Sequence, residues 1–248
     1  RAGAAVGAAA GRASKKSVLE LGGSDAFIVL DDADVEAAAA TAVKARFTNG
    51  GQSCVCAKRF IVAQSVAERF TELFVQGTKA LKVGDPLAEG TQMGPLARAD
   101  LREALQRQVD QSVAAGARLL AGGAALPGEG CYYAPTVLDH VRPGMAVFDD
   151  ETFGPVAAIV VVQDDDEAIH LANATPFGLS VSVWSTSKER AVGVAKHITT
   201  GAVFVNAMTA SDARVPFGGT KKSGYGRELA AAGVREFCNT RTYWVARA

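Results

Sequence analysis

The sequence lacks a net charge, a disulfide-rich composition and a long apolar run. Its 248 residues carry 26 basic and 26 acidic side chains, so neither sign is in excess for binding nucleic acid or an anionic membrane. Its four cysteines are too few for a disulfide scaffold, and no apolar stretch approaches the ~18 residues that cross a bilayer. We therefore expect a globular protein of the reducing cytoplasm that acts on a small molecule.

Histidine is also scarce, and complete nucleotide-binding fingerprints are absent. The three histidines, His140, His170 and His197, are isolated from one another and from the cysteines, which argues against a zinc site or other metal centre. The same isolation weighs against a cysteine-dependent hydrolase, because that enzyme class needs a histidine base near its thiol. Neither a G-x-G-x-x-G turn after a strand nor a P-loop motif occurs, so the sequence shows no complete dinucleotide fingerprint.

Short β-branched runs alternate with segments of helical period along most of the chain. This alternation indicates an α/β fold with a largely parallel sheet. Capping-box spacing predicts helix starts at Ser65 and Thr186, and the acidic run 164–167 indicates a further helix start instead of a metal site. The expected strands are 27–30, 59–62, 157–162, 181–184 and 203–205, and the expected helices include 35–47, 66–74 and 101–113.

The segment 47–59 combines two adjacent glycines, a cysteine and the start of a strand. A helix pattern ends at the glycines, so Cys54 is expected in a tight turn with its side chain and its backbone N–H facing a cleft. That exposure suits a nucleophile, because the thiolate is the reactive form; spacing alone leaves a purely structural cysteine open. Cys56 forms a C-x-C pair with Cys54, for which a reversible oxidation switch is a better explanation than a metal.

A carboxylate inside an apolar run is the second candidate. Glu20 follows Val18 and Leu19 and directly precedes Leu21 and a Gly-Gly turn. Apolar surroundings raise the pKa of a carboxyl, so that it can accept a proton near neutral pH; a solvent-facing glutamate at a strand end is the alternative. Gly154 within 149–156 and four glycines within 215–228 permit special backbone angles or close approach of a ligand.

Taken together and in this order, four motifs resemble those of the aldehyde dehydrogenase superfamily. They are E-L-G-G at 20–23, G-Q-x-C at 51–54, E-x-F-G-P at 151–155 and P-F-G-G-x-K-x-S-G-x-G-R-E at 216–228. The resemblance covers nearly the whole chain. Within the superfamily, E-L-G-G-S-D at 20–25, Q-S-C at 52–54 and R-E-F-C-N at 235–239 are most similar to the NAD(P)-dependent succinate-semialdehyde dehydrogenases.

The resemblance implies catalytic and cofactor-binding roles for particular residues. Cys54 would attack the aldehyde carbonyl to give a thiohemiacetal and then a thioester, with its backbone N–H helping to hold the oxyanion. Glu20 would be the general base for hydrolysis of the thioester. The residues implied to contact NAD or NADP are Gly3, Leu21, Glu151 and Phe153.

The same resemblance implies how the chain is divided into domains. We expect residues 1–21 to be a remnant of a Rossmann-like cofactor-binding domain, 22–228 to be the catalytic domain, and 229–248 to be an oligomerisation tail with a strand over 237–245. Most of the cofactor-binding domain would lie before Arg1, so we expect a C-terminal fragment with negligible activity alone. The intact enzyme is expected to be a homodimer or tetramer; an inactive fragment, or an assembly partner of full-length subunits, is the alternative.

The carboxylate of a succinate semialdehyde substrate has no assigned partner in this sequence. Some relatives place an arginine before the asparagine of the catalytic loop, where this chain has Thr48. Arg214, in the loop before Pro216, is the substrate-binding candidate, because a planar guanidinium can bind a carboxylate through two hydrogen bonds. A solvated loop charge is the alternative.

Overall fold

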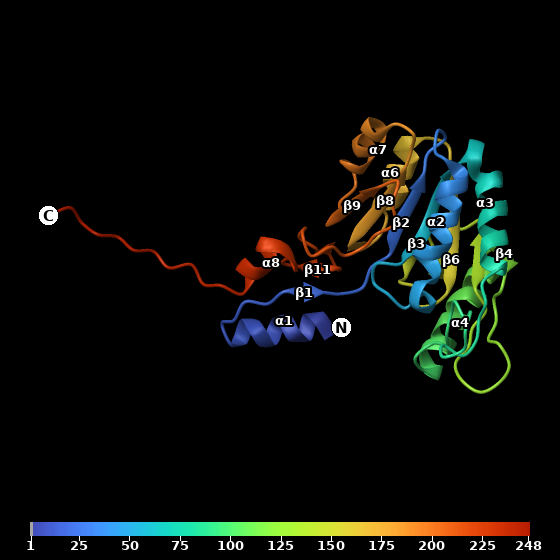
Figure 1. The fold of residues 1–248 in the computed structure, drawn as a ribbon, viewed down its shortest axis with the longest axis horizontal. Coiled ribbons are helices and arrows are strands. Elements are labelled where there is room, and N and C mark those ends of the chain that lie inside the picture. The colour runs from blue at the N-terminus through green and yellow to red at the C-terminus, as the bar shows by residue number, and fades with distance from the viewer. Residues whose placement is uncertain (1) are drawn as a thin grey trace.

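A seven-stranded sheet runs through the centre of the molecule (Figure 1). The computed structural model describes residues 2–248. The strands are β2 (Asp25–Val29), β3 (Ala57–Ala63), β4 (Arg118–Ala121), β5 (Thr136–Asp139), β6 (Val156–Val162), β8 (Ser180–Trp184) and β9 (Ala202–Val205). Their order is β4-β5-β6-β3-β2-β8-β9, and every neighbouring pair is parallel except β4 with β5. The predicted α/β fold with a largely parallel sheet is confirmed, and all five predicted strands are present.

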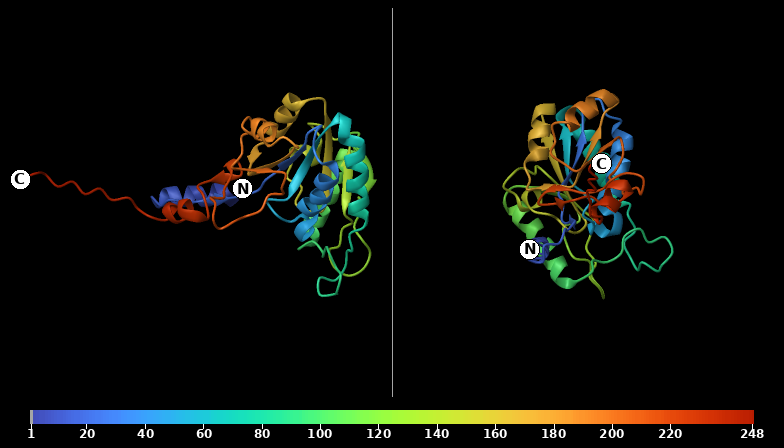
Figure 2. Two further views of the ribbon diagram at one scale, coloured as in Figure 1. Left: turned by 45° about the horizontal axis from the view of Figure 1, so that its top comes forward. Right: turned by 90° about the vertical axis from the view of Figure 1, so that its left-hand side faces the viewer.

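Helices cover both faces of the sheet (Figure 1, Figure 2). They are α2 (Val35–Phe47), α3 (Gln64–Lys79), α4 (Ala99–Ala114), α5 (Ala146–Asp149), α6 (Asp165–Asn173) and α7 (Lys188–Ala195). Phe27 and Phe60 pack with residues of α2 and α3 on one face, while Ile28 and Ile61 belong to the cluster that includes α4 to α7 on the other. All four side chains are buried. Among residues 2–248, no helix has both the length and the apolar character needed to cross a membrane.

One of the predicted helix starts is confirmed and another is wrong. Asp164 caps α6, because its side chain accepts a hydrogen bond from the amide of Glu167 at 2.8 Å. Helix α3 begins at Gln64, directly after Ala63, and has no side-chain cap. The capping box predicted at Ser65 is therefore not formed, since that residue already lies inside the helix.

The predicted start of α7 is displaced by one residue. Ser187, and not Thr186, caps this helix by accepting a hydrogen bond from the amide of Arg190. The hydroxyl of Thr186 instead donates to Asp32 at 2.8 Å. The local sequence pattern favours Thr186 as the helix cap, but its side chain is bound to a distant residue and therefore does not cap the helix.

Elements from the first and last parts of the chain lie together beside the main sheet (Figure 1). The elements there are α1 (Ala2–Arg12), β1 (Leu19–Glu20), β11 (Gly224–Tyr225) and α8 (Ala230–Glu236). β1 and β11 form an antiparallel ladder that pairs Glu20 with Gly224. A second short ladder joins β7 (Phe177–Gly178) to β10 (Thr220–Lys221). Before residue 21, the described chain contributes one helix and one short strand, which is all that it shows of the expected cofactor-domain remnant.

The terminal residues extend away from the body of the molecule (Figure 1). The sequence predicts a strand over 237–245, but residues 238–248 form neither helix nor strand in the described chain. Tyr243 and Trp244 are 80% and 90% exposed. A strand needs a neighbour for its backbone hydrogen bonds, and a single copy of the chain supplies none.

Candidate active site

Three of the sequence motifs precede neighbouring strands of the sheet. Gly23 lies just before β2, Cys54 just before β3 and Gly154 just before β6. Because these strands are parallel and adjacent, their amino ends bring the three motifs to one edge. Ligands of open α/β sheets usually bind at the carboxyl ends of the strands. The candidate site instead lies at the amino ends of β2, β3 and β6.

Close contacts join all four motifs at this edge. The amide of Gly23 donates to Glu151 Oε1 at 3.0 Å, and a Cβ atom added at Gly23 would lie 2.9 Å from the carbonyl oxygen of Cys54. The amide of Gly219 donates to Glu20 Oε1 at 3.2 Å. The structure thus brings together E-L-G-G, G-Q-x-C, E-x-F-G-P and the long motif at 216–228.

Cys54 lies in a turn whose shape depends on glycine. Helix α2 ends at Phe47, and the following 3-10 turn, Thr48–Gly51, has left-handed backbone at Gly50 (φ 62°) and Gly51 (φ 73°). A Cβ atom at Gly51 would collide with the carbonyl of Gly154. The Cys54 thiol is half-buried; burial raises its pKa, while the positive charge of Lys58 acts to lower it.

Glu20 lies at the end of β1, where β11 fixes its backbone. Its Oε1 accepts the Gly219 amide, whereas Oε2 is buried and has no hydrogen-bond partner among the described residues. Burial raises the pKa of the Glu20 carboxyl, and the nearby charge of Glu228 acts in the same direction. This outcome matches the sequence prediction for a carboxylate among apolar neighbours. A buried oxygen without a protein partner is suited to accept a proton from a bound water.

A pocket of about 810 Å³ borders this edge and contains three of the predicted cofactor-binding residues. Gly3, Leu21 and Glu151 all line it, together with other residues of α1 and the turn at 221–225. Gly3 lets α1 approach, because a Cβ atom there would collide with the Leu21 side chain. Phe153, the fourth predicted residue, is 39% exposed and is not part of this lining.

The other two predicted site residues, Arg214 and Cys56, are not part of the pocket lining. The Arg214 side chain is 87% exposed and forms an ion pair with Asp212 at 2.5 Å, so its guanidinium is held by its own loop. Cys56 is buried, and its thiol donates to the carbonyl of Thr48 at 3.6 Å. Cys54 and Cys56 are both free thiols, and the oxidation switch stays a prediction.

Sequence reasoning missed a set of buried charges behind the turn that holds Cys54. Arg46, Lys58 and Arg59 are at most 1% exposed, and Asp25 is 4% exposed. Burial lowers the pKa of Arg46 to about 10 and raises that of Asp25 to about 6. The only signal in the sequence is a Lys-Arg pair at the start of an apolar strand, which also fits an exposed strand end.

Arg46 connects two of the motifs through backbone carbonyls. Its guanidinium donates to Ala57 at 2.8 Å, to Gly51 at 3.0 Å and to Thr152 at 3.1 Å, and it also bonds Gly154. One buried side chain therefore fixes the turn at 51–57 against the segment 152–154.

Replacing Arg46 with methionine should lower the free energy of unfolding by about 3 kcal/mol, because the carbonyls lose their donors inside the protein. Urea denaturation followed by circular dichroism measures the change. Arg69→Met is the matched control, since Arg69 is exposed and its ion pair with Glu36 should contribute at most about 1 kcal/mol. Equal effects of the two substitutions would contradict the assigned role of Arg46.

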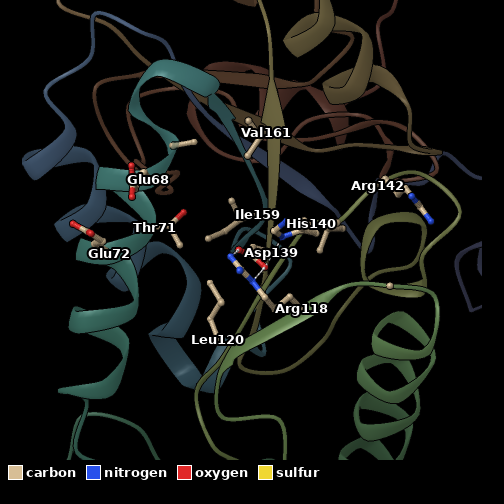
Figure 3. A pocket seen from close by; sticks show the side chains of 13 residues that line it. Glu68, Thr71, Glu72, Arg118, Leu120, Asp139, His140, Arg142, Ile159 and Val161 are labelled. Carbon is tan, nitrogen blue, oxygen red and sulfur yellow. Dashed lines mark hydrogen bonds and ion pairs between the residues drawn. The ribbon is translucent and has the colours of Figure 1, made fainter.

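A second pocket, of about 650 Å³, lies between α3 and the strands β4 to β6 (Figure 3). Glu68 from α3 and His140 lie on its walls, and Arg118 is occupied by an ion pair with Asp139 at 2.5 Å. This pocket is near the carboxyl ends of β5 and β6, and no residue of the four motifs lines it. It is therefore separate from the candidate active site.

Comparisons with known proteins show the family of the chain. The model of the aldehyde dehydrogenase family matches residues 1–243. The chain is 54% identical over 244 residues to the succinate semialdehyde dehydrogenase [NAD(P)+] Sad of Escherichia coli (strain K12), a match that covers 98% of this chain and 53% of that protein. This chain belongs to the aldehyde dehydrogenase family. The resemblance carried by the four motifs is confirmed.

Solved structures of other aldehyde dehydrogenases share the fold. The succinic semialdehyde dehydrogenase of Streptococcus pyogenes, solved in complex with NADP+, matches with a TM-score of 0.96 and 38% identity, covering 100% of this chain and 54% of that chain. The lactaldehyde dehydrogenase of Escherichia coli matches with a TM-score of 0.94 and 34% identity, over 97% and 50% of the two chains. The present chain spans about half the length of the curated aldehyde dehydrogenases that it matches.

Proposed function

We propose that this chain is the catalytic part of an NAD(P)-dependent enzyme that oxidises succinate semialdehyde to the dicarboxylic acid. The observation that carries the proposal is the meeting of a half-buried thiol, a carboxylate with a free buried oxygen and a pocket lined by Glu151 at one edge of the sheet. The choice of substrate is supported by relatives at 48–54% identity that are succinate-semialdehyde dehydrogenases.

Cys54 supplies the nucleophile. Its thiolate adds to the aldehyde carbon, and the carbonyl oxygen becomes an oxyanion that the Cys54 amide N–H can bind. Loss of hydride from the same carbon converts the thiohemiacetal into a thioester. The turn at 51–54 has the fixed, glycine-dependent shape that holding a nucleophile in position requires.

Glu20 acts in the hydrolysis of that thioester. Its free Oε2 takes a proton from a water molecule, the water oxygen attacks the thioester carbonyl, and the carboxylic acid leaves with regeneration of the Cys54 thiol. The pKa of Glu20 is raised and so lies closer to neutral pH, where a carboxyl can both accept and release a proton.

The described residues fit the nicotinamide end of NAD or NADP. The glycines at 3 and 22 leave room in the pocket, since a Cβ atom at Gly22 would collide with the Glu151 carboxylate. Glu151 can accept hydrogen bonds from the ribose hydroxyls, the Leu21 carbonyl can accept one from the carboxamide, and the exposed Phe153 ring can contact the nicotinamide. When bound, the nicotinamide ring accepts the hydride from the substrate carbon.

The proposal extends to domains and assembly. Residues 1–21 would belong to the cofactor-binding domain, 22–228 to the catalytic domain and 229–248 to an oligomerisation tail. The exposed Tyr243 and Trp244 support this role for the tail, because apolar side chains of this size are normally covered. The tail would then form its strand against a neighbouring subunit in a dimer or tetramer.

The test is a hybrid enzyme in which this chain follows the first half of the Escherichia coli Sad protein. The hybrid enzyme should form NAD(P)H from succinate semialdehyde, and the chain alone should show negligible activity because it spans only about half the length of its relatives. A folded hybrid that binds NADP+ but forms no NADPH would refute the proposal. A turnover of the chain alone within about tenfold of the hybrid would refute the need for the other half.

Arg214 is proposed to bind the substrate carboxylate, which requires that it leave Asp212. In the hybrid enzyme, Arg214→Ala should raise the KM for succinate semialdehyde by about tenfold or more, equivalent to one charge-assisted hydrogen bond. The KM for butanal, which has no carboxylate, should stay within about twofold of the unsubstituted hybrid. Equal changes in the two KM values would remove Arg214 from the substrate site.

A further inference from the structure

Lys58 is a buried cation directly behind the predicted nucleophile. It is the second residue of β3, and its side chain is 0% exposed. Its ammonium group does not reach solvent but turns back along the preceding loop. A charge in this position requires partners that replace water.

The partners of Lys58 are the carbonyls of the catalytic turn. Its Nζ donates to the carbonyl oxygens of Ser53 at 3.2 Å, Cys54 at 3.1 Å and Cys56 at 3.3 Å. An ammonium group has three N–H donors, so all of them are used. Within the described chain, Lys58 thus binds the carbonyl of the nucleophile itself.

The bond to the Cys54 carbonyl also orients the next amide. In a trans peptide, the C=O of Cys54 and the N–H of Val55 point in opposite directions. The Val55 N–H acts to lower the pKa of the Cys54 thiol. Because Lys58 holds the Cys54 carbonyl, it also fixes the direction of this N–H.

Lys58 further connects the turn to the predicted cofactor site. Its Nζ lies 3.6 Å from Glu151 Oε1, the oxygen that also accepts the Gly23 amide. Because Glu151 lines the 810 Å³ pocket, one ammonium group contacts both the nucleophile's backbone and the carboxylate of that pocket.

The charged groups around the Cys54 thiol have opposing effects on its pKa. Burial raises the pKa of Cys54, and the carboxylates of Asp25 and Glu20 act in the same direction, whereas Lys58 acts to lower it. The pKa of Lys58 is itself lowered by burial and by Arg46, and Asp25, Glu151 and Cys56 act to raise it. Lys58 is thus the cation that favours the thiolate, and Asp25 is a buried anion that opposes it.

We propose that Lys58 is a positioning residue for the nucleophile, which fixes the Cys54 peptide, ties it to Glu151 and stabilises the Cys54 thiolate. The proposal rests on the proposed function only in taking Cys54 as the nucleophile. Its other parts concern the ionisation of one thiol and can be measured without substrate or cofactor.

The pH dependence of Cys54 alkylation in the full chain tests this role. Iodoacetamide labelling from pH 6 to 10, followed by mass spectrometry of the Cys54 peptide, gives the midpoint of thiol ionisation. Lys58→Gln keeps two N–H donors and removes the charge, so the midpoint should rise by about one pH unit. Lys58→Arg, which keeps the charge, should restore most of that shift. Lys79→Gln, at an exposed position at the end of α3, is the matched control and should leave the midpoint unchanged.

Asp25→Asn provides a second variant with the opposite sign. It removes a negative charge that opposes the thiolate, so its midpoint should fall below that of the unsubstituted chain. A loss of packing alone would not shift the ionisation midpoints of Lys58→Gln and Asp25→Asn in opposite directions. A folded Lys58→Gln chain with an unchanged midpoint overturns the proposal; should that variant unfold, an unchanged or raised midpoint in folded Asp25→Asn overturns it. Either result leaves the dehydrogenase assignment to the hybrid-enzyme assay, so the two failures are distinguishable.

Discussion

Cys54→Ser in the hybrid enzyme is expected to lower NAD(P)H formation on the order of 10⁴-fold. Serine preserves the size of the side chain and the glycine-dependent turn, but its hydroxyl is a far weaker acid than the thiol. Lys58 and the Val55 amide, which favour a thiolate, cannot produce a useful amount of alkoxide at neutral pH. Initial rates with succinate semialdehyde at saturating NADP+ measure the loss.

Cys56→Ser is the control for that substitution. Cys56 is buried and its thiol bonds the Thr48 carbonyl, a contact that a serine hydroxyl can also make. This variant should keep at least about a third of the activity. If the predicted oxidation switch exists, it should also resist reversible inactivation by mild oxidants. Retention of more than a tenth of the activity by Cys54→Ser would identify a different nucleophile.

Glu20→Gln is expected to separate the two halves of the reaction. Hydride leaves before the thioester is hydrolysed, so the hybrid enzyme should still release about one NADPH per active site in a rapid burst. Steady-state turnover should then fall on the order of 10³-fold, because glutamine cannot accept the proton of the attacking water. Stopped-flow absorbance at the NADPH band measures both phases, and mass spectrometry should detect the acyl adduct on Cys54.

The matched control for this substitution is Glu72→Gln on the exposed face of α3. It should alter neither the burst nor the steady rate. Loss of the burst in Glu20→Gln would show that Glu20 is needed before hydride transfer, and an unchanged steady rate would exclude it as the base.

The sequence predicts the sheet and the position of Cys54, the proposed nucleophile, because both depend on local patterns. The runs that become β2 and β3 are buried on both faces, and β6 is buried except at Val161. Parallel neighbouring strands then place the segments before them at one edge. The apolar neighbours of Glu20 in the sequence also predict its raised pKa, although the burial that causes the shift involves the distant segment at 219–224.

The features that the sequence does not predict depend on contacts between distant segments. Thr186 has the spacing of a helix cap, but Asp32 binds its hydroxyl and Ser187 takes its place. Lys58 and Arg46 resemble exposed residues in the sequence, and only the folded chain shows the carbonyls that enclose them. The tail at 237–245 has a strand-like composition, yet residues 238–248 find no strand partner in the described chain.

The pairing of β1 with β11 makes the position of Glu20 depend on residues about 200 positions later in the chain. The turn that holds Cys54 depends on residues up to Gly154, whereas Glu20 is fixed by Gly219 and Gly224. Because a domain generally folds as a unit, Glu20 reaches its final surroundings only in a chain that extends as far as Gly224. A chain truncated before Gly219 would keep the residues that shape the Cys54 turn but lose the partners that fix Glu20.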